Sequence, residues 1–99
     1  KFAAISASSS GNNTLVAAVT SKKIRVLAMS LMANGTVNAK MQSGASGTDL
    51  TGLYYLIANT GFVLPFNPAG WFETAATTLL NLNLSAAIAV GGCLTYIEV

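Results

Sequence analysis

Residues 77–97, TTLLNLNLSAAIAVGGCLTYI, lie within a segment of twenty-four residues, Thr74 to Ile97, that has no charged side chain. About 20 apolar residues suffice for a helix to cross a bilayer, so length alone allows a membrane span. However, leucine alternates with asparagine or serine from Leu80 to Ser85, and a lipid-facing helix would leave those polar groups without hydrogen-bond partners. The period of two instead predicts a β-strand with the leucines on one face, and it argues against a membrane protein.

Short runs of alternating apolar and polar residues also make up the rest of the chain. Gly91 and Gly92 interrupt the quoted segment and alternation then resumes, so we predict two strands joined near residues 85–87. Elsewhere, short alternating runs are separated by Gly, Asn and Ser, as in β-sandwiches and barrels. We therefore predict one all-β domain over residues 1–99, in which residues 1–13 form an N-terminal strand and loop. The predicted strands span residues 2–7, 14–20, 23–33, 36–43, 54–58, 61–64, 71–74, 78–83 and 87–98.

The clearest local turn signal is Asn34-Gly35, because Asn-Gly between two alternating runs is the preferred two-residue type I′ hairpin turn. Such a turn pairs the strand before it with the strand after it and places Met32 opposite Val37. One face of this hairpin then has the composition of a sandwich core. Its residues are Val26, Ala28, Ser30, Met32, Val37, Ala39 and Met41.

The opposite face of the predicted hairpin carries three large apolar residues in a row, Leu27, Met29 and Leu31. Contiguous apolar residues on a solvated face often mark an interaction site. Two explanations stand: a loop of the same chain covers the row, or another subunit does. The second makes Leu27, Met29 and Leu31 the candidate oligomer interface. A slip of one residue at the turn would exchange the two faces.

Charge is scarce throughout the chain. Charged residues make up 8% of the sequence, against roughly 25% in an average soluble protein. Five basic and three acidic residues give a net charge of +2, which is too small and too scattered for a nucleic-acid footprint. The one basic cluster is Lys22, Lys23 and Arg25. It either keeps an edge strand from pairing with other chains or docks onto an acidic partner surface.

The sequence contains no constellation typical of catalysis or metal binding. It has no histidine, the commonest general base and metal ligand. Its three acids, Asp49, Glu73 and Glu98, are well separated, and Cys93 is its only cysteine. We expect Cys93 to be a small buried hydrophobe. The chain is therefore predicted not to be an enzyme and to need no metal or cofactor.

Aromatic residues are concentrated in one part of the chain, where they could form a sugar-stacking or receptor-binding surface. Small β-domains also need large side chains in their cores, and a buried aromatic removes about 150 to 250 Å² from water. We therefore expect most of them in the core, and Tyr54, Tyr55 and Trp71 are the candidate contacts if the function is ligand binding. The six residues within nineteen positions are Tyr54, Tyr55, Phe62, Phe66, Trp71 and Phe72.

Two long strings of the sequence resemble small β-sandwich virion proteins of tailed bacteriophages and prophages, and most closely their capsid decoration, or cement, proteins. The strings are NTLVAAVTSKKIRVLAMSLMANGTVNAKMQSG and NTGFVLPFNPAGWFETAATTLLNLNLSAAIAVGGCLTYIEV. The likeness covers most of the chain from Asn13 onward. It is carried by the long strand with a basic start, the Asn-Gly turn, the LPFNPAGWFET segment and the Leu/Asn alternation, and it includes no motif with assigned chemistry.

The resemblance implies a jelly-roll-like antiparallel β-sandwich that assembles as a homotrimer and attaches to the major capsid protein at the capsid surface of the virion. Under this hypothesis Lys22, Lys23 and Arg25 would dock onto the capsid. Related domains occur in head fibres and tail fibres, so the alternative is a receptor- or glycan-binding head domain of a phage fibre. Neither function requires nucleic acid or a membrane as partner. Strand pattern and charge do not separate the two.

Overall fold

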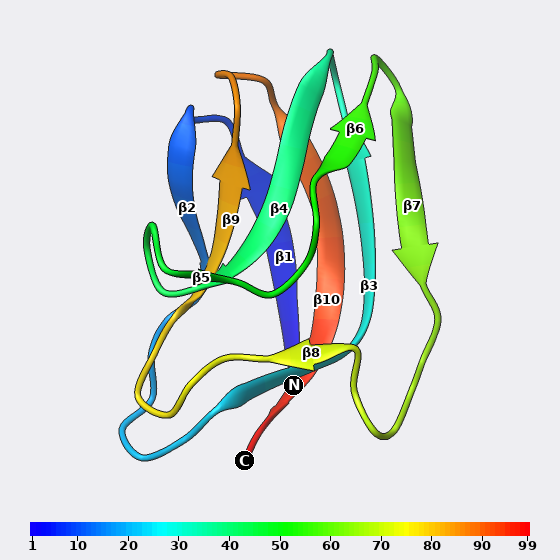
Figure 1. The fold of residues 1–99 in the computed structure, drawn as a ribbon. Coiled ribbons are helices and arrows are strands. Elements are labelled where there is room, and N and C mark those ends of the chain that lie inside the picture. Colours follow the sequence, from blue (N-terminus) through cyan, green and yellow to red (C-terminus); the bar gives the residue numbers. More distant parts are fainter.

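A computed structural model describes residues 1–99, and every regular element in it is a β-strand (Figure 1). The strands form two antiparallel sheets of five strands each. Sheet A has the order β1 (Phe2–Ala7), β10 (Val90–Glu98), β3 (Ile24–Ala33) and β7 (Thr60–Leu64), with β8 (Phe72–Glu73) also paired to β3. Sheet B has the order β2 (Gly11–Val16), β9 (Leu80–Leu84), β4 (Val37–Ser43) and β5 (Thr48–Asp49), with β6 (Tyr54–Leu56) also paired to β4.

The path of the chain between the two sheets is that of a jelly roll. Strands β1 to β4 alternate between sheet A and sheet B, and β6, β7, β9 and β10 alternate in the same way. This places β10 between β1 and β3, and β9 between β2 and β4, which is the double Greek-key arrangement of jelly rolls. The predicted fold class, a single all-β antiparallel sandwich, is confirmed. The structure contains no helix that could span a membrane.

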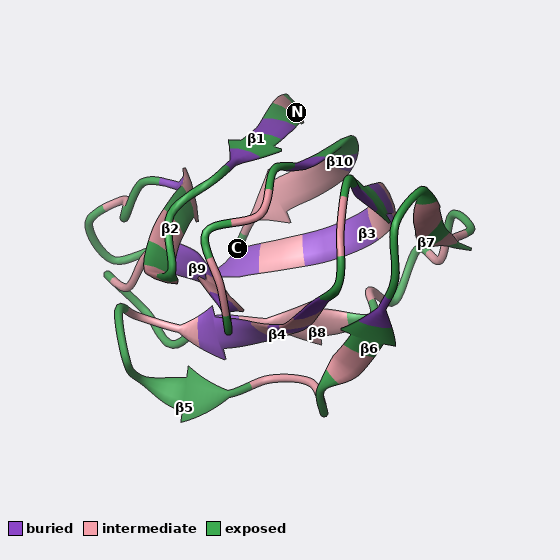
Figure 2. Cartoon of the chain, turned by 90° about the horizontal axis from the view of Figure 1, so that it is seen from above, coloured by how far each residue is buried: buried purple, intermediate pink, exposed green.

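The core lies between the sheets and consists of apolar residues from the long strands of both. Figure 2 shows how far each residue along these strands is buried. The leucines of β9 all point into this core, and Leu80, Leu82 and Leu84 are at most 1% exposed. Full burial of a leucine side chain contributes about 1.5 to 3 kcal/mol. The alternation in residues 80–85 therefore has the predicted consequence, a strand with one face in the core.

The predicted hairpin between β3 and β4 is wrong. β3 belongs to sheet A and β4 to sheet B, so the connection is an arch across the end of the sandwich. Neither Asn34 nor Gly35 has the positive φ that a type I′ turn requires. Instead, the Asn34 N–H donates to the Ala89 carbonyl at 2.9 Å, and Gly35 packs against Ile88. Pairing with β10 and β9, both distant in sequence, overrides the local turn signal.

The predicted assignment of the two faces of β3 is also wrong. Leu27, Met29 and Leu31, expected on the outer face, are 7%, 3% and 3% exposed, and the latter two belong to the core cluster. Met32, expected in the core, is 57% exposed, and Ala28 and Ser30 are half-buried on the same outer side. The other predicted core residues are buried, namely Val26, Val37, Ala39 and Met41.

The exchange of faces follows from the arch between the sheets. Because β3 does not pair with β4, the register of an Asn-Gly turn does not decide which face of β3 meets the core. A β-bulge shifts the register between Thr95 and Tyr96 of β10, which pair with Ala28 and Val26. Leu27 is therefore an extra residue of β3, and both Val26 and Leu27 are buried. Leu27, Met29 and Leu31 are therefore buried within the monomer and expose almost no surface for a contact between subunits.

Two strands differ from the prediction: β2 begins earlier than expected, and β5 is not predicted at all. β2 begins at Gly11, within the polar run predicted to be a loop, because Asn12 and Asn13 pair with Asn83 and Leu82 of β9. β5 lies at Thr48–Asp49, where no strand is predicted. In both cases polar residues of low strand propensity are held by pairing with a strand that is already fixed in the core.

A buried polar network occupies part of the outer side of sheet B. Asn81 points away from the core but is 0% exposed, and its Nδ2 donates to Asn12 Oδ1 and Gln42 Oε1, both at 2.9 Å. Gln42 Nε2 in turn donates to Asp49 Oδ1 at 3.0 Å. The Ser46 N–H donates to Asn12 Oδ1 at 2.9 Å, which holds the loop after β4 over the sheet. The loop after β4 thus covers this part of the outer side of sheet B.

Candidate functional surface

The part of the outer face of sheet A that runs from Phe2 to Gly61 is an uncharged surface built mostly from small side chains. The register aligns its residues in rows across the strands, so that each row can be read directly from the pairing. Phe2, Met32 and Val63 project from it and are 85%, 57% and 70% exposed. The rows are Phe2, Thr95 and Ala28; then Ala4, Cys93, Ser30 and Val63; then Ser6, Gly91, Met32 and Gly61.

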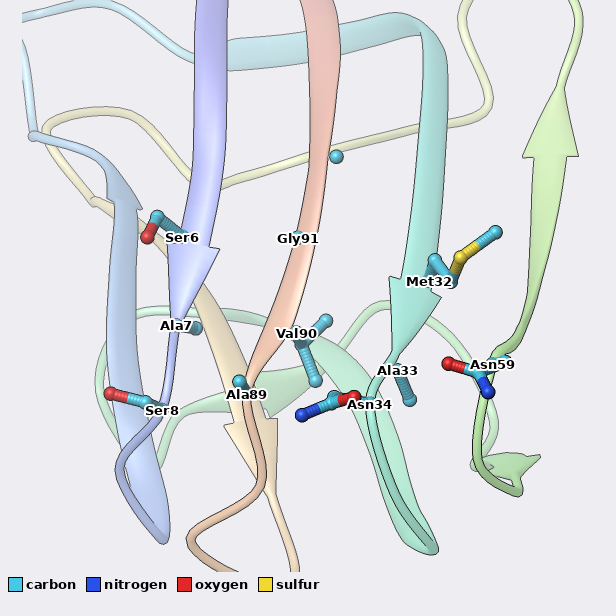
Figure 3. A pocket seen from close by; sticks show the side chains of 11 residues that line it. Ser6, Ala7, Ser8, Met32, Ala33, Asn34, Asn59, Ala89, Val90 and Gly91 are labelled. Atoms are coloured by element: carbon cyan, nitrogen blue, oxygen red, sulfur yellow. The ribbon is translucent and has the colours of Figure 1, made fainter.

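Three hollows lie on this one face. The largest has a volume of about 540 Å³ and is bounded by the ends of β1 and β3, the start of β10 and Asn59 (Figure 3). The second, of about 270 Å³, lies between Met32 and Val63, and the third, of about 220 Å³, lies between Val63 and Cys93. No charged residue lines any of the three. The face is therefore suited to an uncharged contact, not to an ionic ligand.

Met32 forms a wall shared by the first two hollows, and its exposure has a simple cause. In its row it pairs with Gly91 of β10 on one side and Gly61 of β7 on the other. Side chains directly opposite each other in a sheet normally cover one another, but neither glycine has one. The Met32 side chain thus has no neighbouring side chain in its row, and the space left above Gly91 and Gly61 contributes to the first two hollows.

Cys93 lies on the same face, which corrects the prediction that it is buried. It is exposed, and its Sγ lies 3.6 Å from Ser30 Oγ in the neighbouring strand. The reason is the alternation of side chains along β10. Leu94 points into the core, so its neighbour Cys93 points outward.

The basic cluster is placed differently from the prediction. β3 is paired on both sides, with β10 and with β7 and β8, so it is not an edge strand that lysines protect. Arg25 contacts Glu73 of β8 at 2.8 Å, and Lys23 approaches the same carboxylate at 3.4 Å. Of the three cations, only Lys22 makes no ion pair. Docking of this cluster onto a capsid stays a prediction, with much of its charge balanced by Glu73.

Glu73 should make the stability of the domain depend on acid pH. The hydrogen bond from Arg25 lowers the pKa of Glu73 below its ordinary value of 4.5. A lowered pKa in the folded state means that the ionised carboxylate stabilises the fold above pH 4.5 and that this contribution is lost as pH falls through the folded-state pKa. We expect the Tm of Glu73→Gln to fall less on acidification than the wild-type Tm, as measured by circular dichroism.

Asp49 sets the control for that experiment. Hydrogen bonds from Gln42 and Lys40 lower its pKa as well, so part of the acid dependence should remain in Glu73→Gln and disappear in a variant that also carries Asp49→Asn. Equal acid dependence in the wild type and the double variant would contradict the assignment of the two carboxylates.

The aromatic residues do not form one surface. Tyr54 stacks on Phe62 with ring centroids 4.1 Å apart, joining the start of β6 to β7. Tyr55 is 77% exposed on β6 of sheet B. Trp71 is 44% exposed beside β3 of sheet A, where its backbone N–H donates to the Val26 carbonyl. None of Tyr54, Tyr55 and Trp71 lines a hollow.

The expectation that most of the six aromatic residues lie in the core is thus only half right. Tyr54, Phe62 and Phe72 pack partly buried against the core, and Tyr55, Phe66 and Trp71 are exposed. The indole Nε1 of Trp71 donates to the Pro65 carbonyl at 2.8 Å, which fixes the ring against its own loop.

Comparisons of the chain with family models, with curated proteins and with solved structures found no match.

Proposed function

We propose that this protein is a non-enzymatic structural component of a bacteriophage virion, a capsid decoration protein that binds the assembled head through the outer face of sheet A. The observation that carries the proposal is the character of the hollowed part of that face, which has no charged lining residue and exposes the apolar side chains of Phe2, Met32 and Val63. Large apolar side chains exposed on one face of a domain often mark an interaction site. The resemblance to cement proteins supplies the identity of the partner, the major capsid protein.

A protein of this kind stabilises a shell by mass action. It binds the assembled shell and not the dispersed subunits, and the assembled state gains RT ln(1 + [L]/Kd) for each site. This is about 2.7 kcal/mol per site when the free protein is at 100 times Kd. Many identical sites on one shell multiply the effect, so a small domain with no chemistry of its own can determine whether a head survives.

The alternative function, receptor or glycan binding by a fibre head, has one observation in its favour, the exposure of Tyr55 and Trp71. Sugar-binding sites hold aromatic faces beside a pocket. Here the two residues are associated with different sheets and neither borders a hollow. The geometry therefore favours the decoration role.

The proposal is tested by mixing the purified protein with heads that lack it and measuring binding by co-sedimentation. The wild-type protein should bind to saturation and raise the temperature at which the heads break open. Val63→Asp places a carboxylate in the proposed contact, and we expect it to weaken binding about tenfold or more, because a charge desolvated without a partner is costly.

Tyr55→Asp is the matched control, because it introduces the same charge at an equally exposed position on sheet B. It should bind as the wild type does. Loss of binding in Tyr55→Asp with retention in Val63→Asp would place the contact on sheet B, and loss of binding to cells or glycans in Trp71→Ala would support the fibre-head role instead.

A further inference from the structure

We infer that two copies of the chain pair through the free edge of β1, with Phe2 of each copy inserted toward the largest hollow of the other. The inference deepens the proposed function by naming the contact through which the protein meets a second copy of itself, and it rests on that proposal only for the biological role of the dimer. Four observations carry it: the unpaired backbone of β1, its lack of charge, the exposure of Phe2 and the glycine beside Ser6.

The backbone of β1 is paired on one side only. Lys1 and Tyr96 exchange two hydrogen bonds of 2.9 Å, so they form one of the closely bonded pairs of the β1–β10 ladder. Such pairs alternate with pairs that exchange no hydrogen bonds in an antiparallel ladder. Counting from Lys1, the backbone groups of Phe2, Ala4 and Ser6 therefore point away from β10, toward the free edge.

Nothing within the chain satisfies these groups. None of the backbone hydrogen bonds outside the strand ladders involves Phe2, Ala4 or Ser6. β1 is the terminal strand of sheet A, and Figure 2 shows it at the border of the sheet with no strand beyond it. An edge of this kind presents three N–H groups and three carbonyls, which is a template for an additional strand.

The usual protection of an edge strand is absent here. Natural proteins block edges with charged side chains, proline or bulges. Residues 2–7, FAAISA, contain no charge and no proline, and their register with β10 is unbroken. The charged groups of Lys1 are engaged within the chain: its side chain is paired with Glu98 at 3.1 Å, and its amine donates to the Tyr96 carbonyl at 2.9 Å. No charged side chain of residues 2–7 thus opposes the approach of a second β1.

The free edge is complementary to itself. If two β1 strands pair antiparallel about a twofold axis at Ala4, Ala4 faces Ala4 of the second copy and Phe2 faces Ser6 of the second copy. All three free residues then exchange hydrogen bonds with their counterparts, because each carries one donor and one acceptor. The two A sheets become one continuous sheet, and the contact is isologous and closes with two copies.

In the same register, the exposed Phe2 side chain can pack against the second copy. Phe2 is 85% exposed on the outer face, and in the paired arrangement it lies beside Ser6 of the second copy, on the same side of the sheet. Ser6 pairs with Gly91, and both line the 540 Å³ hollow. With no side chain at Gly91, the Phe2 ring can lean over Ser6 toward that hollow. Each copy thus supplies one ring and receives one.

The test is the mass of the protein in solution, measured by sedimentation equilibrium up to about 100 µM, where a contact of micromolar affinity is saturated. We expect twice the chain mass of 10.1 kDa. Ala4→Pro removes a free-edge N–H without touching the β1–β10 ladder, and Phe2→Asp removes the ring. Each should raise the dimer dissociation constant about tenfold or more, with an unchanged circular dichroism spectrum and Tm.

Val63→Pro and Phe66→Asp are the matched controls, since they make the same substitutions at exposed positions away from β1. Both should remain dimers. The inference would be overturned by a wild-type monomer, by the homotrimer that the resemblance implies, or by a dimer that survives Ala4→Pro and Phe2→Asp. Its failure is separable from that of the proposed function: a monomer that still binds heads refutes only the dimer, and a dimer that does not bind heads refutes only the decoration role.

Discussion

Met29→Lys is expected to unfold the domain. Met29 lies in the middle of β3, the central strand of sheet A, with Leu94 of β10 beside it on one side and Leu64 of β7 on the other. It is 3% exposed and belongs to the core cluster. No acid belongs to that cluster, so the lysine ammonium would be buried without a partner. Such burial costs several kcal/mol, a large part of the roughly 5 to 15 kcal/mol by which a typical domain is stable.

Met32→Lys is the control for this prediction, because it makes the same substitution in the same strand on the opposite face. Met32 is 57% exposed, so its lysine can remain in water, and we expect a Tm close to that of the wild type. Far-UV circular dichroism and thermal melting distinguish the two variants. A folded Met29→Lys together with an unfolded Met32→Lys would show that β3 presents the other face to the core.

The strands could be predicted from the sequence because their signal is local. The alternation of leucine and asparagine in β9 requires only that one face be apolar, and it gave both the element and its buried side correctly. The fold class followed from the repetition of such runs between glycine, asparagine and serine. In these segments residue chemistry and burial lead to the same answer.

The faces of β3 could not be predicted because its sequence has no period to read. From Val26 to Met32 only Ser30 is polar, so alternation does not distinguish inward from outward positions. The choice then depended on the turn at Asn34-Gly35, and the turn does not form. What fixes the faces is pairing with β10 and β7, whose residues lie about thirty to seventy-five positions away, and contacts of that kind leave no mark in a short window of sequence.

The candidate surface escaped prediction for a related reason. Its defining feature is the absence of side chains on both sides of Met32, and Gly61 and Gly91 are brought to that residue only by the sheet. A signal did exist, since glycine within a strand often marks a place where another group approaches closely. Gly91-Gly92 and Gly61 carry that signal, but nothing in the sequence indicates that they lie in one row.

Gly92→Ala is expected to be the most damaging small substitution in β10. Gly92 has a φ of +154°, a conformation that residues with a side chain rarely adopt. A Cβ at this position would lie 2.0 Å from the Ser30 carbonyl oxygen of β3, a backbone atom that cannot move aside alone. Relief would require β10 to shift against β3 and lose ladder hydrogen bonds. We expect a loss of about 2 to 4 kcal/mol of unfolding free energy, or on the order of 10 to 30 °C in Tm.

Gly91→Ala tests whether this loss comes from the geometry of one residue or from any methyl group in the strand. A Cβ on Gly91 would meet nothing nearer than the Ile5 carbonyl oxygen at 3.7 Å, which is ordinary contact, and Gly91 has no positive φ. Its alanine variant should stay within about 1 kcal/mol of the wild type in urea denaturation. The two neighbouring glycines thus predict opposite results for the same substitution, because only one of them meets the backbone of the central strand. Equal stability of the two variants would mean that β10 does not pair with β3 in the register that aligns Gly91 with Met32, and the hollowed face built on that row would have to be abandoned.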